Sequence, residues 1–569
     1  MATRSLTTDN LSLLKGPPLA DEPGLGALTL PGFLREVTTR FASREALVMH
    51  RREDVVRWSY ADLWQRSVQV ARSLVSMGVG KGTHVGILMT NRLEWLSATF
   101  GAWLAGAIAV PLSTFSTPAE LDYLLRVSCV SALMFEGTVV KKDFVAILGE
   151  LEPATVRSVP GMLQSIKYPF LRHLAVVDAP ASGAIESWEA FLSRGSTTPA
   201  ALVESIVDTA LPTDTAALFF SSGSTARPKG IINSHRGIAI QFWRFARHSS
   251  LREDARAWTP NGFFWSGNCA TVMGATLACG GADILQSTFN PREALELMQA
   301  ERVNFPMVWP HQARLLQEAP NWLTVDLSAM TYLDATNPMA SHPSIRLNGW
   351  NEPRHSYGST ETFTISTGYP NDVSALVAAG SHGVALAGNT IKIVDPLSGR
   401  TLPIGEHGEI AVKGPTLMLG YLGIPPEEAF DEEGYYPTGD GGYVDTAGRL
   451  FFEGRLTTVI KTGGANVSPL EVDHVLEAMP GIKAIGTVGV PDDLLGEMVV
   501  ACIVPLEGAV LDAAAVIAFA RERLASYKVP RRVLFLREED IELTGTSKIK
   551  PKELRKLAAA RIKAQTTDS

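Results

Sequence analysis

Short apolar runs alternate with amphipathic helical patterns over most of the chain. Tyr60–Leu74 has the apolar spacing of a helix, and Val85–Met89 (VGILM) has the length and composition of a buried strand. Glu94–Leu104 again fits a helix, and Ile108–Leu112 again fits a strand. The alternation continues to about residue 454. It predicts parallel sheets covered by helices, which is an α/β fold.

One uncharged stretch approaches the length of a membrane span. Trp95–Leu112 carries no charge over 18 residues. It contains serine, threonine, glycine and proline, and it ends in the strand-like run AIAVPL. We interpret it as a buried helix that leads into a core strand, and we predict no integral membrane segment.

The pattern changes near residue 454. The remaining residues contain a helix start at Ser468 and Pro469, followed by strand-like runs and a second helical pattern. We therefore predict two domains. Residues 1–454 form a large domain with parallel-rich sheets flanked by helices, and residues 455–569 form a small α+β domain.

Charge and cysteine content narrow the class of protein. The formal net charge is −8, which argues against a general nucleic-acid binder, because such proteins carry a basic surface. The four cysteines have no spacing typical of zinc, so we expect small buried hydrophobic side chains and a reducing, cytoplasmic location. They are Cys129, Cys269, Cys279 and Cys502.

A loop rich in glycine and hydroxyl groups follows the apolar run Ala216–Phe220. It reads SSGSTARPKG over Ser221–Gly230. Small residues let backbone N–H groups approach an anion, hydroxyls can donate to phosphate oxygens, and a lysine adds positive charge. A polar surface turn would use similar residues, but this density of hydroxyls after a strand favours phosphate binding. The candidate phosphate-binding residues are Ser221, Ser222, Gly223, Ser224, Thr225 and Lys229.

This loop resembles the signature loop of the adenylate-forming superfamily, which includes acyl-CoA synthetases. The usual form has glycine where this chain has Ala226. The resemblance extends from about Trp58 to Lys552. It implies a large N-terminal AMP-binding domain and a mobile C-terminal lid domain, with the site in the cleft between them.

Tyr357-Gly358-Ser359-Thr360-Glu361 resembles the second nucleotide motif of that superfamily. The resemblance implies that Tyr357 packs on adenine, Thr360 touches the phosphates and Glu361 helps to hold magnesium. The residue types fit these roles, because an aromatic ring stacks on a purine and a carboxylate suits a hard cation.

Two later motifs follow in the superfamily's order. Asp440, in Tyr-Pro-Thr-Gly-Asp, and Arg455 resemble the residues that bind the ribose and phosphate. Lys548 resembles the catalytic lysine, although Ser547 replaces the usual glycine. The hinge position two residues after Arg455 is Thr457, where Asp or Lys is usual.

The acyl pocket of the superfamily corresponds to the region around Phe264, Trp265 and Gly267. No aspartate that could pair with a substrate amine occurs between Trp258 and Gly267. An aromatic wall without a counter-charge favours an uncharged, apolar acid. Trp309 is a further candidate for this wall.

The acceptor of the acyl group is inferred from the loop around Gly463 and Gly464, which resembles the loop that lines the pantetheine tunnel of CoA ligases. No carrier-domain serine motif occurs. The prediction is an acid–thiol ligase, an ATP-dependent acyl-CoA synthetase for a hydrophobic fatty, cyclic or aromatic acid. Its cofactors are ATP, Mg²⁺ and coenzyme A.

Two alternatives stay open at this point. The enzyme could load the acyl group onto a separate carrier protein, or the chain could be a non-catalytic ligand-binding relative, as the substitutions at Ala226, Thr457 and Ser547 suggest. The expected partners are a small carboxylic acid and CoA, without nucleic acid. The sequence leaves the acid and the oligomeric state open, a homodimer included.

Overall fold

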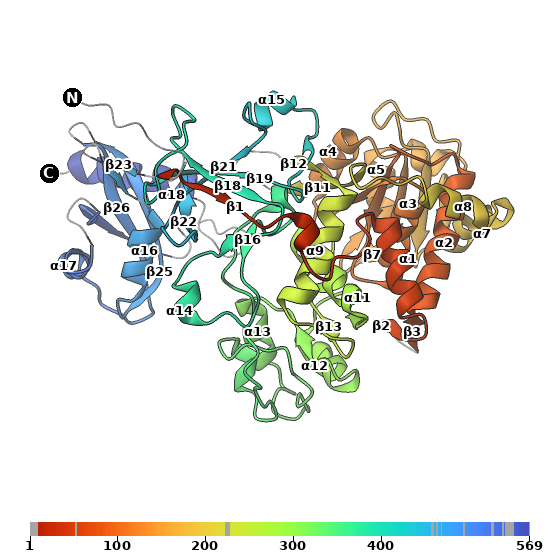
Figure 1. Ribbon diagram of the computed structural model, residues 1–569, viewed down its shortest axis with the longest axis horizontal. Coiled ribbons are helices and arrows are strands. Elements are labelled where there is room, and N and C mark those ends of the chain that lie inside the picture. The colour runs from red at the N-terminus through yellow and green to blue at the C-terminus, as the bar shows by residue number, and fades with distance from the viewer. Residues whose placement is uncertain are drawn as a thin grey trace. The chain divides into compact units, whose positions relative to one another are not determined.

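Two largely parallel sheets organise residues 15–390 and 412–436, one of the two units into which the computed structural model divides (Figure 1). The other unit comprises the described parts of residues 1–14, 391–411 and 437–569. These two units are defined by how closely their residues pack. The predicted boundary at residue 454 concerns something else, a small domain that rotates, and it stays a prediction. The structure describes residues 10–51, 54–221, 228–456, 460–462, 465–467, 469–492, 495–524, 528–537, 540 and 551–567.

The larger sheet of the first unit has eight strands. Six neighbouring strands pair in parallel, and the last two pair antiparallel at one edge. In spatial order they are β10 (Ile185–Ser187), β9 (His173–Val177), β6 (Ala132–Glu136), β4 (His84–Leu88), β5 (Ile108–Pro111), β11 (Thr215–Ser221), β12 (Lys229–Ser234) and β20 (Gly420–Tyr421).

A second sheet of five strands has four parallel strands and one antiparallel edge strand. Each of its parallel strands is short and mostly buried, so apolar runs rather than alternating patterns mark them in the sequence. Their spatial order is β15 (Phe305–Pro306), β13 (Arg256–Trp258), β14 (Ala282–Leu285), β2 (Glu45–His50) and β3 (Val55–Ser59).

Helices with clear start signals connect these strands. The Ser59 side chain accepts a hydrogen bond from the Asp62 backbone, and the Asp62 carboxylate accepts one from the Ser59 backbone, which forms a capping box. The longer helices of this unit are α1 (Leu30–Arg40), α2 (Tyr60–Ser76), α3 (Leu93–Leu104), α4 (Pro118–Ser128), α5 (Phe144–Leu151), α7 (Trp188–Arg194), α8 (Ala200–Val207), α9 (His235–His248), α12 (Pro291–Ala300) and α13 (Pro310–Gln317).

The second unit is α+β and has two five-stranded sheets. In spatial order, the strands of its first sheet are β1 (Leu13–Lys15), β18 (Thr390–Val394), β19 (Gly408–Lys413), β21 (Tyr436–Val444) and β22 (Leu450–Arg455). Its second sheet and helices are β24 (Ala465–Val467), β23 (Ile460–Thr462), β26 (Gly496–Pro505), β25 (Ile482–Asp492), β27 (Arg532–Phe535), α16 (Pro469–Glu477), α17 (Ala513–Arg521) and α18 (Pro551–Thr567).

These elements confirm the predicted mixed α/β fold. Trp95–Leu112 is a buried helix followed by a core strand, as expected. Among the described residues, no helix is long and apolar enough to cross a membrane. The expectation for the cysteines was wrong in part, because Cys129 is exposed. It ends helix α4 in a left-handed conformation, which turns the chain out of the helix.

Candidate active site

The carboxyl ends of three parallel strands lead into an aromatic cluster formed by Phe115, Phe264, Trp265 and Trp309. Phe115 follows β5, the two central residues follow β13, and Trp309 follows β15. The Trp265 ring is stacked between Phe115 and Trp309, with centroid distances of 5.8 and 5.7 Å. The carboxyl edge of parallel strands is the usual place for a ligand site in α/β folds.

A buried network of three amides holds this loop in place. The Asn91 side chain donates to the Asn261 carbonyl at 2.9 Å and accepts from the Phe263 backbone at 2.9 Å. The Gln312 amide donates to the Asn261 side chain at 2.9 Å and accepts from the Trp309 backbone at 3.0 Å. The two segments that carry Trp265 and Trp309 are therefore linked by hydrogen bonds.

Next to this cluster lies a cavity of about 430 Å³. Gly267 opens onto it, and a Cβ atom at that position would meet nothing within 4 Å. The π-helical segment η4 (Cys269–Gly274) contributes Thr271, and such segments are frequent at functional sites. The lining residues are Phe245, Ser249, Ser266, Gly267, Thr271, Met307, Glu352, Pro353, Ser356, Gly358, Ser359, Thr360, Thr364 and Ile365.

The cavity is therefore bounded by Gly358, Ser359 and Thr360 of the second predicted motif and by Gly267 of the predicted acyl pocket. Phe264 and Trp265 are not part of its described lining, so their role as a pocket wall stays a prediction. Tyr357 is buried just before this motif.

The backbone of the second motif is tightly constrained. A Cβ atom on Gly358 would lie 1.7 Å from the Thr364 carbonyl oxygen, so only glycine fits there. Phe363 and Thr364 both have positive φ angles, 44° and 97°. Among the described residues, the buried hydroxyls of Ser359 and Thr364 have no hydrogen-bond partner. Strained backbone and unpaired buried hydroxyls around a cavity are typical of a ligand site.

The structure brings Glu361 and Lys229 together through Tyr421. The Tyr421 hydroxyl donates to Glu361 Oε1 at 2.8 Å, and Lys229 Nζ lies 5.0 Å from the centroid of the Tyr421 ring. The hydroxyls of Tyr421 and Tyr436 are also 2.8 Å apart. Burial, followed by the Glu361 charge, raises the pKa of Tyr421, so this hydroxyl stays a donor.

The first phosphate-binding candidates lie at the end of the β11–β12 pair. Lys229 is directly opposite Ser221 in this antiparallel pair. Ser222, Gly223, Ser224 and Thr225 lie outside the described residues, as does the side chain of Ser221. The two strands fix where the connecting loop begins and ends.

The second unit contains the predicted ribose site. Asp440 and Arg455 face each other across β21 and β22, and Arg455 Nε lies 2.8 Å from Asp440 Oδ1. Arg455 also donates to the Thr438 carbonyl at 3.0 Å. Asp440 is buried, and burial together with the Asp440 charge raises the pKa of nearby Glu409. Lys548, Ser547, Thr457, Gly463 and Gly464 lie outside the described residues.

Sequence reasoning missed three features of this site. Tyr421 carries no motif of its own and reaches Glu361 over 60 residues of chain. The amides of Asn91 and Gln312 meet only in the folded chain. Glu352 lines the cavity and pairs with Arg354 at 3.3 Å, and it lies far along the chain from the stretch Trp258–Gly267, which has no acidic residue.

Two protein-family models match this chain. The model of the AMP-binding enzyme family matches residues 34–422, and that of the AMP-binding enzyme C-terminal domain matches residues 471–548. Feruloyl-CoA synthase of Amycolatopsis sp is 31% identical over 504 residues, which cover 88% of this chain and 93% of that protein. Indoleacetate–CoA ligase of Aromatoleum aromaticum is 30% identical over 517 residues, which cover 90% of this chain and 95% of that protein.

Among solved structures, ATP-bound MatB from Rhodopseudomonas palustris has the same fold, with a TM-score of 0.72 and 24% identity. The match covers 93% of this chain and 99% of that one. The chain therefore belongs to the AMP-binding enzyme family, in its acyl-CoA ligase branch, and is an AMP-forming acid–thiol ligase.

Proposed function

We propose that this enzyme activates a hydrophobic, compact carboxylic acid with ATP and transfers the acyl group to coenzyme A. In the first step a carboxylate oxygen attacks the α-phosphorus, the bond to the β-phosphate breaks, and pyrophosphate leaves. In the second step the CoA sulfur attacks the acyl carbon, the bond to AMP breaks, and the thiol proton passes to solvent.

The observation that carries this proposal is the joining of the two nucleotide motifs by Tyr421. Its hydroxyl holds Glu361 at 2.8 Å while its ring lies 5.0 Å from the Lys229 ammonium. A cation and a carboxylate are thereby kept in one region without neutralising each other directly. Such a pair suits a triphosphate with its metal ion, because the lysine attracts phosphate oxygens and the carboxylate attracts the metal.

The residues fit a magnesium ion as well. Glu361 is half-buried, and Tyr421 occupies one of its two carboxylate oxygens. No group of three or more His, Cys, Asp or Glu side chains in the described part of the chain could hold a metal. A magnesium ion at Glu361 would thus take its remaining ligands from phosphate oxygens and water, as is usual for this ion. When bound, it would neutralise charge on the departing pyrophosphate.

The cavity beside the second motif supports a compact acid. Its apolar lining from Phe245, Met307 and Ile365 favours a hydrophobic group, and its volume of about 430 Å³ is at the lower end of small-molecule sites. The unpaired hydroxyls of Ser359 and Thr364 could donate to the carboxylate or phosphate oxygens at the motif end. The names of the two relatives specify ring-bearing acids, and the cavity volume is compatible with an acid of that size.

The remaining roles follow the superfamily resemblance. Asp440 would accept hydrogen bonds from the ribose hydroxyls, with Arg455 holding its carboxylate at 2.8 Å. Lys548 would neutralise the charge that develops on the α-phosphate and the attacking carboxylate. Gly463 and Gly464 would line the path of the pantetheine arm.

A product assay tests the proposal. The full chain is incubated with ATP, Mg²⁺, CoA and a panel of ring-bearing, straight-chain and amino acids, and AMP, pyrophosphate and acyl-CoA are measured. We expect equal amounts of the three products, with ring-bearing or medium-length acids preferred. AMP formation without acyl-CoA, accompanied by acylation of an added carrier protein, would contradict the CoA assignment.

A further inference from the structure

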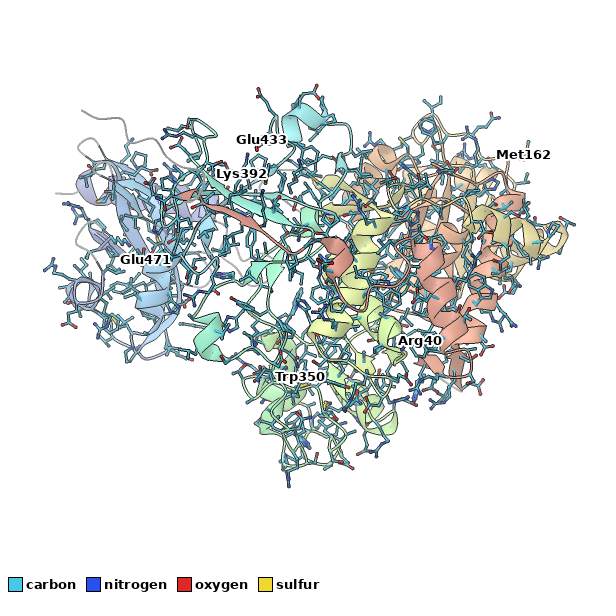
Figure 2. All side chains as sticks on the ribbon, viewed as in Figure 1. Arg40, Met162, Trp350, Lys392, Glu433 and Glu471 are labelled. Carbon is cyan, nitrogen blue, oxygen red and sulfur yellow. The ribbon has the colours of Figure 1, made fainter. Side chains whose placement is uncertain are left out.

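Residues 153–177 present apolar side chains to solvent on an otherwise well-anchored segment. Ile166 is fully exposed, and Val159, Met162 and Phe170 are 61%, 65% and 53% exposed. Figure 2 labels Met162, at the outer edge of the first unit. Most surface apolar residues of a soluble protein occur singly, whereas a series of them marks an interaction surface.

The backbone of this segment is fixed, because alternate side chains are buried. Leu163, Tyr168 and Leu171 are part of the core that the eight-stranded sheet forms with helices α4 and α5. The Tyr168 hydroxyl also donates to Asp122 at 2.6 Å. Buried and exposed apolar positions therefore alternate along one segment, and the exposed ones are held outward instead of collapsing onto the protein.

The charge of the segment is unusual for this chain. No Asp or Glu occurs from Pro153 to Val177, whereas Arg157, Lys167 and Arg172 do, in a protein with a net charge of −8. Lys167 lies 2.8 Å from Asp122, which also pairs with Arg126, and the Glu152 carboxylate accepts a hydrogen bond from the Ser165 hydroxyl of this segment. The four basic side chains Arg126, Arg157, Lys167 and Arg172 outnumber these two carboxylates, which leaves an excess of positive charge. The surface therefore combines apolar side chains with local positive charge.

We propose that this segment, the basic apolar loop (residues 156–172), docks the enzyme on an anionic lipid bilayer. Apolar side chains that enter the boundary between headgroups and acyl chains, with basic side chains among the headgroups, are the features that bind proteins to such surfaces. A bilayer also requires no matching shape. A second copy of the chain fits less well, because two such loops would bring like charges together.

Sedimentation of the full chain with vesicles tests this. Binding is measured to vesicles of phosphatidylcholine alone and of phosphatidylcholine mixed with phosphatidylglycerol. We expect binding to the mixed vesicles and weaker binding in high salt, since screening acts on the charged part. Ile166→Asp should weaken binding about tenfold by placing a charge at the inserted position. Arg157→Gln should weaken it about fivefold.

Two further variants control for folding and for nonspecific effects. Leu376→Asp changes another highly exposed apolar residue elsewhere in the same unit, 87% exposed, and should leave binding unchanged. Ile166→Trp should retain binding, and its added fluorescence should be quenched by brominated lipid. Absence of binding by the wild-type chain, or equal binding by Ile166→Asp, would overturn the proposal. So would a dimer in solution that Ile166→Asp dissociates without vesicle binding.

Discussion

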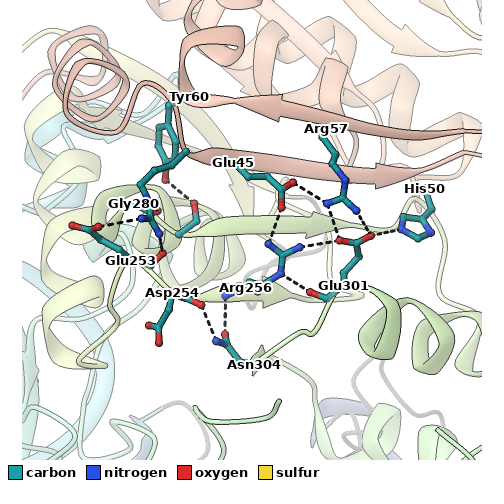
Figure 3. Close-up of polar contacts among 12 residues, drawn as sticks. Glu45, His50, Arg57, Tyr60, Glu253, Asp254, Arg256, Gly280, Glu301 and Asn304 are labelled. Carbon is teal, nitrogen blue, oxygen red and sulfur yellow. Dashed lines mark hydrogen bonds and ion pairs between the residues drawn. The ribbon is translucent and has the colours of Figure 1, made fainter. Parts of the chain in front are cut away.

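The five-stranded sheet of the first unit carries two clusters of opposite character. An ion cluster of Glu45, His50, Arg57, Arg256 and Glu301 crosses β13, β14, β2 and β3 (Figure 3). The aromatic cluster follows the carboxyl ends of β13 and β15 in the same sheet. The ion cluster satisfies its own charges, whereas the aromatic cluster borders a cavity with unpaired hydroxyls.

Glu301 is the centre of the ion cluster. Arg57 donates to both of its carboxylate oxygens at 2.9 and 2.7 Å, Arg256 donates at 2.8 Å, and His50 Nε2 lies 2.6 Å away. Burial opposes ionisation of Glu301, but these hydrogen bonds outweigh it and lower its pKa below the ordinary 4.5. The charged groups of this cluster pair with one another, so we assign it to stability and the aromatic side to function.

The largest expected effect is on catalysis. Glu361→Gln keeps the shape of the side chain and removes its charge, and we expect about 3 kcal/mol of lost transition-state stabilisation, roughly a hundredfold in kcat. The thermal midpoint should stay within a degree or two of wild type, as should that of the control Glu427→Gln in α15 (Pro426–Ala429). An unchanged magnesium titration of activity would contradict the metal role of Glu361.

For the ion cluster we expect the opposite result, a loss of stability without a large loss of kcat. Glu301→Gln leaves Arg57 and Arg256 without their shared carboxylate, and because Arg57 is partly exposed we expect a loss of about 2 kcal/mol in the free energy of unfolding. Its matched control is Glu296→Gln, whose exposed pair with Arg292 should contribute below about 0.5 kcal/mol. A large drop in kcat at temperatures where Glu301→Gln is folded would break the division between the two clusters.

A change in the amide network should affect both the stability of the protein and its KM for the acid. Gln312→Ala leaves the buried Asn261 amide unpaired, which we expect to cost about 1–2 kcal/mol of stability and to raise KM for the acid several-fold. Gln317→Ala, at the end of the same helix α13, should leave KM unchanged. Urea unfolding and acid titrations of both variants decide whether the network positions the pocket.

A smaller effect is expected from the stacked indole. An apolar site gains about 0.8 kcal/mol for each methylene buried, so kcat/KM should rise with the size of the acid until the pocket is full. Trp265→Ala removes the middle ring of the stack and should move this limit towards bulkier acids while weakening smaller ones. An identical size profile in the two proteins, or a preference for acetate or a free amino acid, would refute the role of Trp265.

The smallest expected effect is on the pH dependence of the free energy of unfolding. A carboxylate with a lowered folded-state pKa contributes stability above its ordinary pKa of 4.5, and this stability is lost as the pH falls through the lower folded value. The difference in unfolding free energy between wild type and Glu301→Gln should therefore narrow below pH 4.5. A difference that stays constant down to acid unfolding would mean that the charge of Glu301 contributes nothing.

The sequence predicts the parts of this molecule that are local. Buried strands and capped helices, such as the one that begins after Ser59, follow from apolar runs and capping residues. Gly358 is recognisable because its motif is continuous, and its conformation follows from the close approach of Thr364. Tyr421, Glu352 and the amide of Gln312 could not be found in this way, because their partners are distant in the chain and no spacing rule connects them.

Exchange of labelled pyrophosphate into ATP, without CoA, tests the central claim most directly. An enzyme that forms an acyl-adenylate should incorporate label only when a suitable acid is present, and AMP should accumulate once CoA is added. Lys548→Ala should abolish most of this exchange while sparing thioester formation from pre-made acyl-adenylate. Release of ADP and phosphate, or exchange that does not depend on any acid, would contradict the account.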